Sequence, residues 1–224
     1  MKTKTNKFIL SAVLGTALMV SISSCKKDRD DIGTSGSITF ANTVEGSAAQ
    51  DTYVDDSKTN SSGLAYGSAS GNVSVATGNR TIAFKNTGTA TATAAGTVNV
   101  GENTSTTVFL VKNTDGSLAI SSYANDNASV SGKAKVRFIN VAPLLSSTVN
   151  VLTSTGASLV SALSFKVSSA YQTIDANTAL NVNVSGSLET TAIAGSEFQA
   201  GKVYTVWFDN STTTKVKYHV IVHN

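Results

Sequence analysis

Charged residues are scarce in this chain of 224 residues. Asp, Glu, Lys and Arg make up 14% of it, where an ordinary globular domain has about 25%. Stretches rich in Ala, Glu, Lys, Leu and Arg are missing, which argues against a helical bundle. Hydrophobic residues reach 41%, whereas disordered chains combine low hydrophobicity with high net charge. No basic stripe is present, so the sequence predicts no nucleic-acid partner.

A single cysteine and two histidines restrict the possible chemistry. A lone thiol excludes an intramolecular disulfide and any metal site built from several cysteines. The chain has no G-x-S-x-G nucleophile elbow, no H-E-x-x-H motif, no P-loop and no G-x-G-x-x-G loop. Two of the 14 acidic residues could form a glycosidase pair, but the acids stand mostly in turn-like contexts. We therefore predict that the protein is not an enzyme and needs no cofactor.

The first 24 residues have the pattern of a lipoprotein signal peptide. Three lysines precede an apolar run of 15 residues, Phe8–Ile22. A membrane span needs about 20 apolar residues, so this run suits the shorter core of a signal sequence. It leads into Ile22-Ser23-Ser24-Cys25, the pattern of a bacterial lipobox, in which small residues admit the peptidase and the thiol accepts diacylglycerol. We expect cleavage before Cys25 and lipidation of Cys25.

Residues 25–36 are predicted to form a charged tether. Cleavage would remove three lysines and no acid, so 14 basic and 14 acidic residues would remain, with a formal net charge of zero. The tether contains six consecutive charged residues: Lys26, Lys27, Asp28, Arg29, Asp30 and Asp31. Cys followed by Lys-Lys-Asp resembles lipoproteins of the Bacteroidetes group, in which a charged, acidic stretch after the Cys acts as a surface-export signal. This resemblance implies an outer-membrane lipoprotein displayed on the cell surface, and a periplasm-facing lipoprotein is the alternative.

Beyond the tether, alternating apolar and polar residues predict an all-β fold. In Leu180-Asn181-Val182-Asn183-Val184, apolar side chains recur at every second position, which places them on one buried face of a strand. Asn113–Gly116 lies between two apolar segments and predicts a hairpin. Beyond the signal sequence, no segment keeps a helical period for three turns.

The chain also contains an internal repeat. Ser37–Asn42 corresponds to Lys135–Asn140, and Thr107–Leu110 corresponds to Thr205–Phe208, both 98 residues later. Each half has about 90 residues and roughly seven strand candidates, which suits an immunoglobulin-like β-sandwich. We predict two tandem sandwich modules, and one larger β-sandwich is the alternative. The expected boundaries are residues 37–123 for the first module, 124–132 for the linker and 133–224 for the second module.

The start of the second half resembles a known family. Lys135–Pro143, followed by Val149-Asn150-Val151, is similar to the opening of the domain of unknown function 4397 family. Those domains begin with a strand of this kind, then an Ala/Ser-Pro turn, then a strand of Asp-Val-Tyr-Val type. In the first half, Asp51-Thr52-Tyr53-Val54-Asp55 is similar to the last of these elements. The resemblance implies β-sandwich modules of bacterial surface proteins and carries over no catalytic residues.

The two histidines, His219 and His223, lie in Lys215–His223, the clearest alternating segment of the chain. Four residues along a strand span about 13 Å. A zinc ion, whose ligand bonds are about 2 Å, cannot be shared over that distance. We expect the face with the histidines to be solvated and the opposite face to be buried. The side chains predicted on the buried face are Val216, Tyr218, Val220 and Val222.

Acidic and aromatic residues give two further candidates. Asp51, Asp55 and Asp56 form the densest acidic group after the tether, but a calcium ion needs six to eight oxygens, so we interpret them as turn residues. Trp207 lies in a segment that is apolar on both faces, which predicts a buried indole on a central strand; an exposed platform that stacks on sugars is the alternative. No metal site is predicted. The expected core residues are Phe40, Phe84 and Phe109 in the first module and Phe138, Leu180 and Trp207 in the second.

These features predict a lipid-anchored protein of the cell envelope with a non-enzymatic structural or adhesive role. Its expected partners are the membrane, through the lipid, and a surface glycan or protein. A carbohydrate-binding module of a nutrient-uptake system is one alternative and would need an exposed aromatic row or a groove. A fimbrial subunit that assembles by strand donation is another. Because the first half must close internally with Leu118–Tyr123, we expect Lys215–His223 to pair within its own chain.

We predict that a chelator leaves the melting temperature unchanged, because the only cysteine is assigned to lipidation and the two histidines cannot converge. Thermal unfolding followed by circular dichroism, with and without EDTA, measures this. A decrease of several degrees would instead indicate a structural cation at Asp51, Asp55 and Asp56.

Overall fold

The computed structural model describes residues 33–224 of the chain. The expected signal peptide (1–24), the lipidation site Cys25 and the charged residues Lys26–Asp31 lie outside the described residues. Only the end of the tether is described, and the first strand already begins at Ser35.

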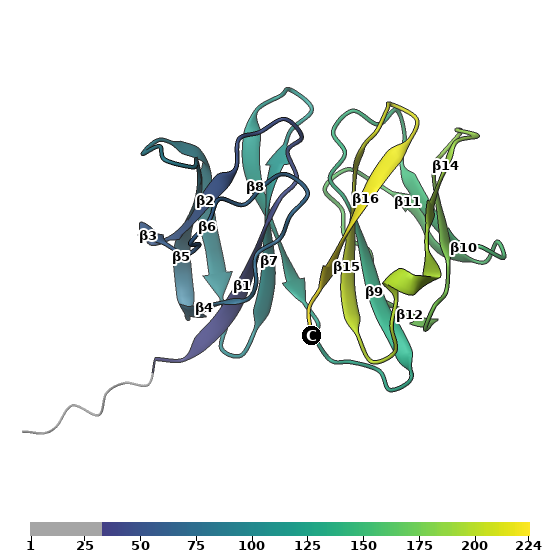
Figure 1. The fold of residues 1–224 in the computed structure, drawn as a ribbon, viewed down its shortest axis with the longest axis horizontal. Helices are drawn as coiled ribbons and strands as arrows, with labels where there is room; N and C mark the ends of the chain where they lie inside the picture. The colour runs from purple at the N-terminus through teal and green to yellow at the C-terminus, as the bar shows by residue number, and fades with distance from the viewer. Residues whose placement is uncertain (1–32) are drawn as a thin grey trace, which may run out of the picture. The chain divides into compact units, whose positions relative to one another are not determined.

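Strands make up most of the described residues (Figure 1). The first half contains β1 (Ser35–Asn42), β2 (Gln50–Val54), β3 (Ser57–Lys58), β4 (Val73–Ala76), β5 (Gly78–Asn86), β6 (Ala92–Val100), β7 (Ser105–Lys112) and β8 (Leu118–Asn125). The second half contains β9 (Lys133–Asn140), β10 (Val149–Thr153), β11 (Ser158–Leu163), β12 (Gln172–Asp175), β13 (Leu180–Val184), β14 (Thr190–Ile193), β15 (Val203–Asn210) and β16 (Val216–Val222). The one helical element among residues 33–224 is a single 3-10 turn, Gly195–Glu197. The prediction of an all-β fold is therefore confirmed.

Each half is a sandwich of two four-stranded sheets. The first half has an inner sheet of order β4-β1-β7-β8 and an outer sheet of order β3-β2-β5-β6. The second half repeats both orders with every strand number raised by eight, as β12-β9-β15-β16 and β11-β10-β13-β14. In both inner sheets the first and seventh strands of the half pair in parallel, β1 with β7 and β9 with β15. The predicted pair of repeated sandwich modules is thus present in the structure.

A buried asparagine closes the same turn in each half. The Nδ2 of Asn42 donates to the carbonyl of Leu64 at 3.1 Å, and the Nδ2 of Asn140 donates to the carbonyl of Leu163 at 3.1 Å. The Oδ1 of each asparagine also accepts a hydrogen bond from the backbone N–H two residues later. Asparagine suits this place because its amide can replace backbone partners at the end of a strand.

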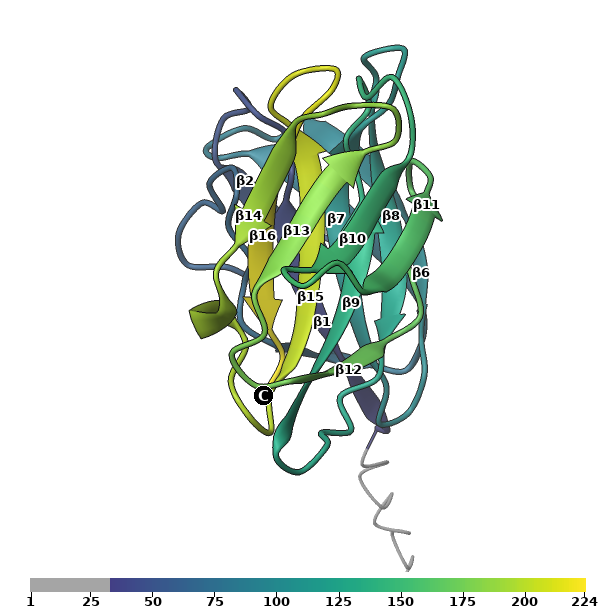
Figure 2. The same cartoon turned by 90° about the vertical axis from the view of Figure 1, so that its right-hand side faces the viewer.

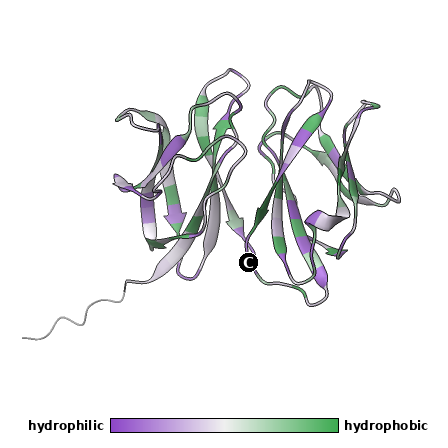
Figure 3. Ribbon diagram, viewed as in Figure 1, coloured by the Kyte–Doolittle hydropathy of each residue, from purple (hydrophilic) through white to green (hydrophobic). Residues whose placement is uncertain are grey.

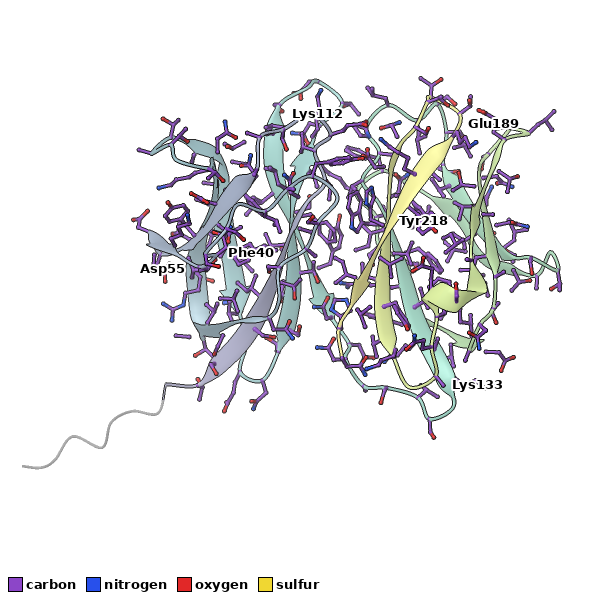
Figure 4. The ribbon with its side chains drawn as sticks, in the orientation of Figure 1. Phe40, Asp55, Lys112, Lys133, Glu189 and Tyr218 are labelled. Carbon is purple, nitrogen blue, oxygen red and sulfur yellow. The ribbon has the colours of Figure 1, made fainter. Side chains whose placement is uncertain are left out.

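Each sandwich has its own apolar core between its two sheets. Figure 4 shows Phe40 between the sheets of the first sandwich, and its ring packs edge to face on Phe84 at 5.8 Å. In the second sandwich Phe138 stacks on Phe208 at 6.0 Å. Apolar residues recur along the strands of both halves (Figure 3). In Figure 2, β10 and β13 of the outer sheet stand in front of β9 and β15 of the inner sheet.

A third core, not predicted from the sequence, joins the two inner sheets to each other. Its buried members are Ala41, Phe109, Val111, Ile139, Val141, Trp207 and Ile221. Phe109 and Trp207 are buried as expected, but they contact the opposite sandwich rather than the core of their own. Because both faces of the inner sheets are covered, β1, β7, β9 and β15 are buried along nearly their whole length.

The third core is built from equivalent positions of the two repeats. Phe109 and Trp207 are 98 residues apart, and their rings meet edge to face with centroids 6.4 Å apart. Ala41 and Ile139 are also 98 residues apart and belong to the same cluster. An interface in which each patch meets its own equivalent is isologous, as in a twofold dimer. The two halves therefore pack like the subunits of a homodimer within one chain.

The prediction of a solvated face on β16 is wrong. On that face Ile221 is 5% exposed and His223 is 8% exposed, whereas Val222, predicted to be buried, is 54% exposed. The reason is the third core, because it covers the side of the inner sheet that a lone sandwich would leave in water. An alternating pattern cannot show whether a polar face meets solvent or a second module.

We predict that Trp207→Ala destabilises the protein by about 3–5 kcal/mol and uncouples the two sandwiches. The reason is that the indole fills the core that both modules share. Differential scanning calorimetry should show a broadened or split transition for this variant. Phe138→Ala, in the core of one sandwich, should cost a similar amount while unfolding stays a single transition. A single unshifted transition for Trp207→Ala would contradict the coupling.

Candidate functional site

His219 lies at the boundary between the two sandwiches. Its imidazole stacks on Trp207, with centroids 3.9 Å apart and planes at 9°, and it meets Tyr66 of the first sandwich edge to face at 5.5 Å. Gly67 touches the same ring, because a Cβ there would stand 2.9 Å from Cε1 of His219, and its φ of +79° also favours glycine. Burial lowers the pKa of His219, so this residue serves as a packing group of the interface.

A charged network borders this stack. The hydroxyl of Tyr66 donates to Oδ2 of Asp209 at 2.5 Å, and Lys217 forms an ion pair with Glu45 at 2.7 Å. Burial raises the pKa of Asp209, and burial together with the bond to Asp209 raises the pKa of Tyr66 to about 12. Because Tyr66 and Glu45 come from one sandwich and Asp209 and Lys217 from the other, these bonds fix the orientation of the interface.

His223 belongs to a second polar group, at the other end of the inner sheet. Its Nε2 is 2.7 Å from Oγ1 of Thr205, which also accepts a hydrogen bond from Nε of Arg137 at 2.8 Å. The Nδ1 of the same ring is buried without a hydrogen-bond partner among residues 33–224. Burial and the nearby charge of Arg137 lower the pKa of His223 to about 4.

Arg137 is the residue that sequence analysis missed. It is 2% exposed and donates to the carbonyl of Ala124 at 2.5 Å and to Oδ1 of Asn125. Through these bonds the second sandwich holds the end of β8 and the start of the connection between the halves. One signal could have revealed it: the equivalent residue of the first repeat is Thr39, so the repeat exchanges a small neutral side chain for a cation.

A pocket of about 480 Å³ opens beside Arg137, at the junction of the two sandwiches. We call it the junction pocket. The residues that line it are Ser122, Tyr123, Ala124, Asn125, Asp126, Arg137, Ser168, Ser169, Ala170 and Tyr171. The hydroxyl of Tyr171 is buried without a hydrogen-bond partner in the described part of the chain. The pocket therefore combines a buried cation, a free hydroxyl and several serine side chains.

The acidic group near β2 is only partly the set of turn residues predicted. Asp55 and Asp56 do lie in the turn after β2, both with positive φ, and Figure 4 shows Asp55 on the outer sheet of the first sandwich. Asp51, in contrast, lies within β2, is 3% exposed and forms an ion pair with Lys58 at 2.8 Å. The hydrogen bond from Lys58 lowers the pKa of Asp51, so this acid is a buried structural partner.

Residues 33–224 contain no cluster of three or more His, Cys, Asp or Glu side chains arranged around a common point. The same range contains no helix with the length and hydropathy of a membrane span.

We predict a loss of stability at low pH that depends on His223. The folded state keeps this imidazole neutral down to about pH 4, whereas the unfolded chain binds a proton below about pH 6.5. Stability is therefore complete above pH 6.5 and decreases as the pH falls towards 4, by up to about 3 kcal/mol. Urea unfolding of the wild type and His223→Gln between pH 7 and pH 4 isolates this contribution. Parallel pH profiles for the two proteins would contradict it.

One family model matches the chain. The model, described as a domain of unknown function (DUF4397), covers residues 36–147, from β1 through β9 and into the loop that follows. No curated protein matches at a significant level. The match includes Lys135–Pro143, the segment on which the family resemblance was based. It covers the first sandwich and only the first strand of the second. With half of its length matched by this model, the chain belongs to the DUF4397 family.

Proposed function

We propose that this protein is a lipid-anchored component of the cell envelope with a non-enzymatic structural or adhesive role. The proposal is based on the packing of residues 33–224 into one compact unit, in which the third core holds the two sandwiches together. A body whose two halves share an apolar core presents its loops and outer sheets at constant spacing. That property suits a structural or adhesive module better than a protein that closes around a substrate.

The sequence before β1 supports attachment by a lipid. The apolar run and the Ile22-Ser23-Ser24-Cys25 pattern precede the described body, and β1 begins ten residues after Cys25. The nine residues between them could extend to about 30 Å. We propose that the charged residues Lys26–Asp31 keep this segment solvated and direct the protein to the outer surface of the outer membrane.

Two alternatives are less well supported. A sugar-stacking platform at Trp207 is disfavoured because the indole is 1% exposed. Strand donation is disfavoured because β16 pairs with β15 of its own chain from Val216 opposite Asn210 to Val222 opposite Tyr204. Its other edge is unpaired in the described sheet, but Lys215 and Lys217 beside it discourage edge-to-edge association.

We predict that Cys25→Ser moves the protein from the membrane fraction to the soluble fraction, because the thiol is the proposed attachment point of the lipid. Cell fractionation and metabolic labelling with a fatty acid measure the anchor. Partition of the variant wholly with the membrane would show that another segment holds the protein.

A matched variant separates anchoring from export. Replacement of Asp28, Asp30 and Asp31 by Ser keeps Cys25 and should leave membrane attachment unchanged. Protease treatment of intact cells should then degrade the wild type and spare the variant. Equal protection of both proteins would favour the periplasm-facing alternative.

A further inference from the structure

Arg137 is a buried cation with neutral partners only. Its three hydrogen bonds go to a hydroxyl, a backbone carbonyl and an amide oxygen, and within residues 33–224 no carboxylate lies within ion-pair distance of it. A guanidinium has five N–H donors, so two remain after these bonds. Burying a charge without a counter-ion is costly, and burial lowers the pKa of Arg137 accordingly.

The other charges at the junction pocket cancel each other. Asp126 is the one acidic residue that lines the pocket, and its Oδ2 is 2.6 Å from Nζ of Lys135. Lys135 Nζ also donates to the carbonyl of Ala128. His223 is neutral, because its pKa is about 4. The remaining positive charge of the pocket belongs to Arg137, and it favours a monoanion.

Tyr171 supplies a second unsatisfied group. Its ring lies 5.3 Å from Cζ of Arg137 and 5.1 Å from Nζ of Lys135. Its hydroxyl is buried without a partner among the described residues. A buried hydroxyl left unpaired costs about 1–3 kcal/mol, and an acceptor atom of a ligand in the pocket would satisfy it.

The first repeat has neutral, polar side chains at the positions that correspond to Arg137 and Tyr171. In the second repeat Val136 lies opposite Gln172, and in the first repeat Ile38 lies opposite Val73. The equivalents of Arg137 and Tyr171 are therefore Thr39 and Asn72, and Oγ1 of Thr39 donates to Oδ1 of Asn72 at 2.8 Å. The sandwich therefore closes with a small, mutually satisfied pair. The second repeat replaces that pair by a cation and a phenol. Arg137 also holds Ala124 and Asn125 at the connection, whereas the hydroxyl of Tyr171 bonds to no described residue, so packing alone does not account for the phenol.

The walls of the pocket indicate the kind of anion. Ser122, Ser168, Ser169 and Asn125 line it. The hydroxyls of Ser168 and Ser169 donate to backbone carbonyls and keep a lone pair each, so they can accept hydrogen bonds from the hydroxyls of a sugar. Asn125 is held by Arg137, Thr107 and Ser105 and serves as a wall of the pocket. Aliphatic anchors larger than alanine are absent from the lining. The volume of about 480 Å³ falls in the range of small-molecule sites. A planar guanidinium matches a carboxylate in shape as well as charge.

We propose that the junction pocket binds the carboxylate of a small acidic sugar, with Arg137 as the anion-binding residue and the hydroxyl of Tyr171 as a second donor. The proposal goes beyond envelope anchoring, since it depends only on residues 33–224. A failure of lipidation at Cys25 and a failure of sugar binding are therefore separate results.

The first test compares two sugars that differ only at C6, where one has a carboxylate and the other a hydroxymethyl group. D-Galacturonate and D-galactose are titrated against the full chain in detergent, and binding is followed by isothermal calorimetry and by saturation-transfer NMR. We expect saturable binding of galacturonate in the millimolar range and no saturation with galactose. Equal behaviour of the two sugars, or no saturation with either, would overturn the proposal.

The second test asks whether Arg137 and Tyr171 bind a ligand or only stabilise the fold. Tyr171→Phe removes a hydroxyl that bonds to no described residue, so the melting temperature should stay the same or rise while galacturonate affinity falls about five- to tenfold. Arg137→Lys keeps the charge but loses the planar fork, and affinity should fall at least as far. Tyr53→Phe on the outer sheet is the matched control and should bind like the wild type. Unchanged affinity in both Tyr171→Phe and Arg137→Lys would overturn the proposal and show that Arg137 only holds the connection between the halves.

Discussion

The apolar contact between the two inner sheets is the constraint on which the rest of this structure depends. Phe109 of one sandwich and Trp207 of the other meet at its centre, surrounded by small and branched residues of the same strands. Full burial of a large apolar side chain contributes about 1.5–3 kcal/mol. Each inner sheet has two apolar faces, one packed on its own outer sheet and one packed on the other inner sheet. A sandwich alone would leave the second of these faces in water. The two modules are repeats in sequence but form one compact body.

Polar residues at the edge of this contact acquire their properties from it. His219 and His223 stand on a face that the partner sandwich covers, and burial lowers the pKa of both. Asp209 and Tyr66 bond across the boundary, and burial raises the pKa of each. Fixed hydrogen bonds of this kind orient two apolar surfaces that could otherwise slide past each other.

The repeat also shows where the two halves have diverged. Strand orders, the parallel inner pairs and the turn-closing asparagines Asn42 and Asn140 are the same in both. At one position a satisfied Thr39–Asn72 pair in the first half becomes Arg137 and Tyr171 in the second. Arg137 holds the connection between the halves, which explains part of this difference, but the hydroxyl of Tyr171 bonds to no described residue and points to a role that only the second half has.

The sequence by itself determined the strands and the repeat. Strands and turns follow from local patterns, such as the alternation in Leu180–Val184 and the turn residues of Asn113–Gly116. These patterns reflect backbone conformation and the burial of one strand face. The repeat is visible because the same patterns return 98 residues later. The burial of Phe40, Phe84, Phe138 and Leu180 follows from the same pattern.

Only the tertiary structure decided what covers the second face of each inner sheet. The residues Lys215–His223 alternate as a strand with one apolar and one polar face. That pattern is the same whether the polar face meets water or packs against a second module. Trp207 was correctly expected to be buried, but its contact with Phe109 of the other half required both sheets to be in place. Arg137 lies in an ordinary strand pattern, and its missing counter-ion is visible only when Thr205, Ala124 and Asn125 stand around it. Long-range packing sets these features, because the groups that make them are 12 to 98 residues apart in the chain.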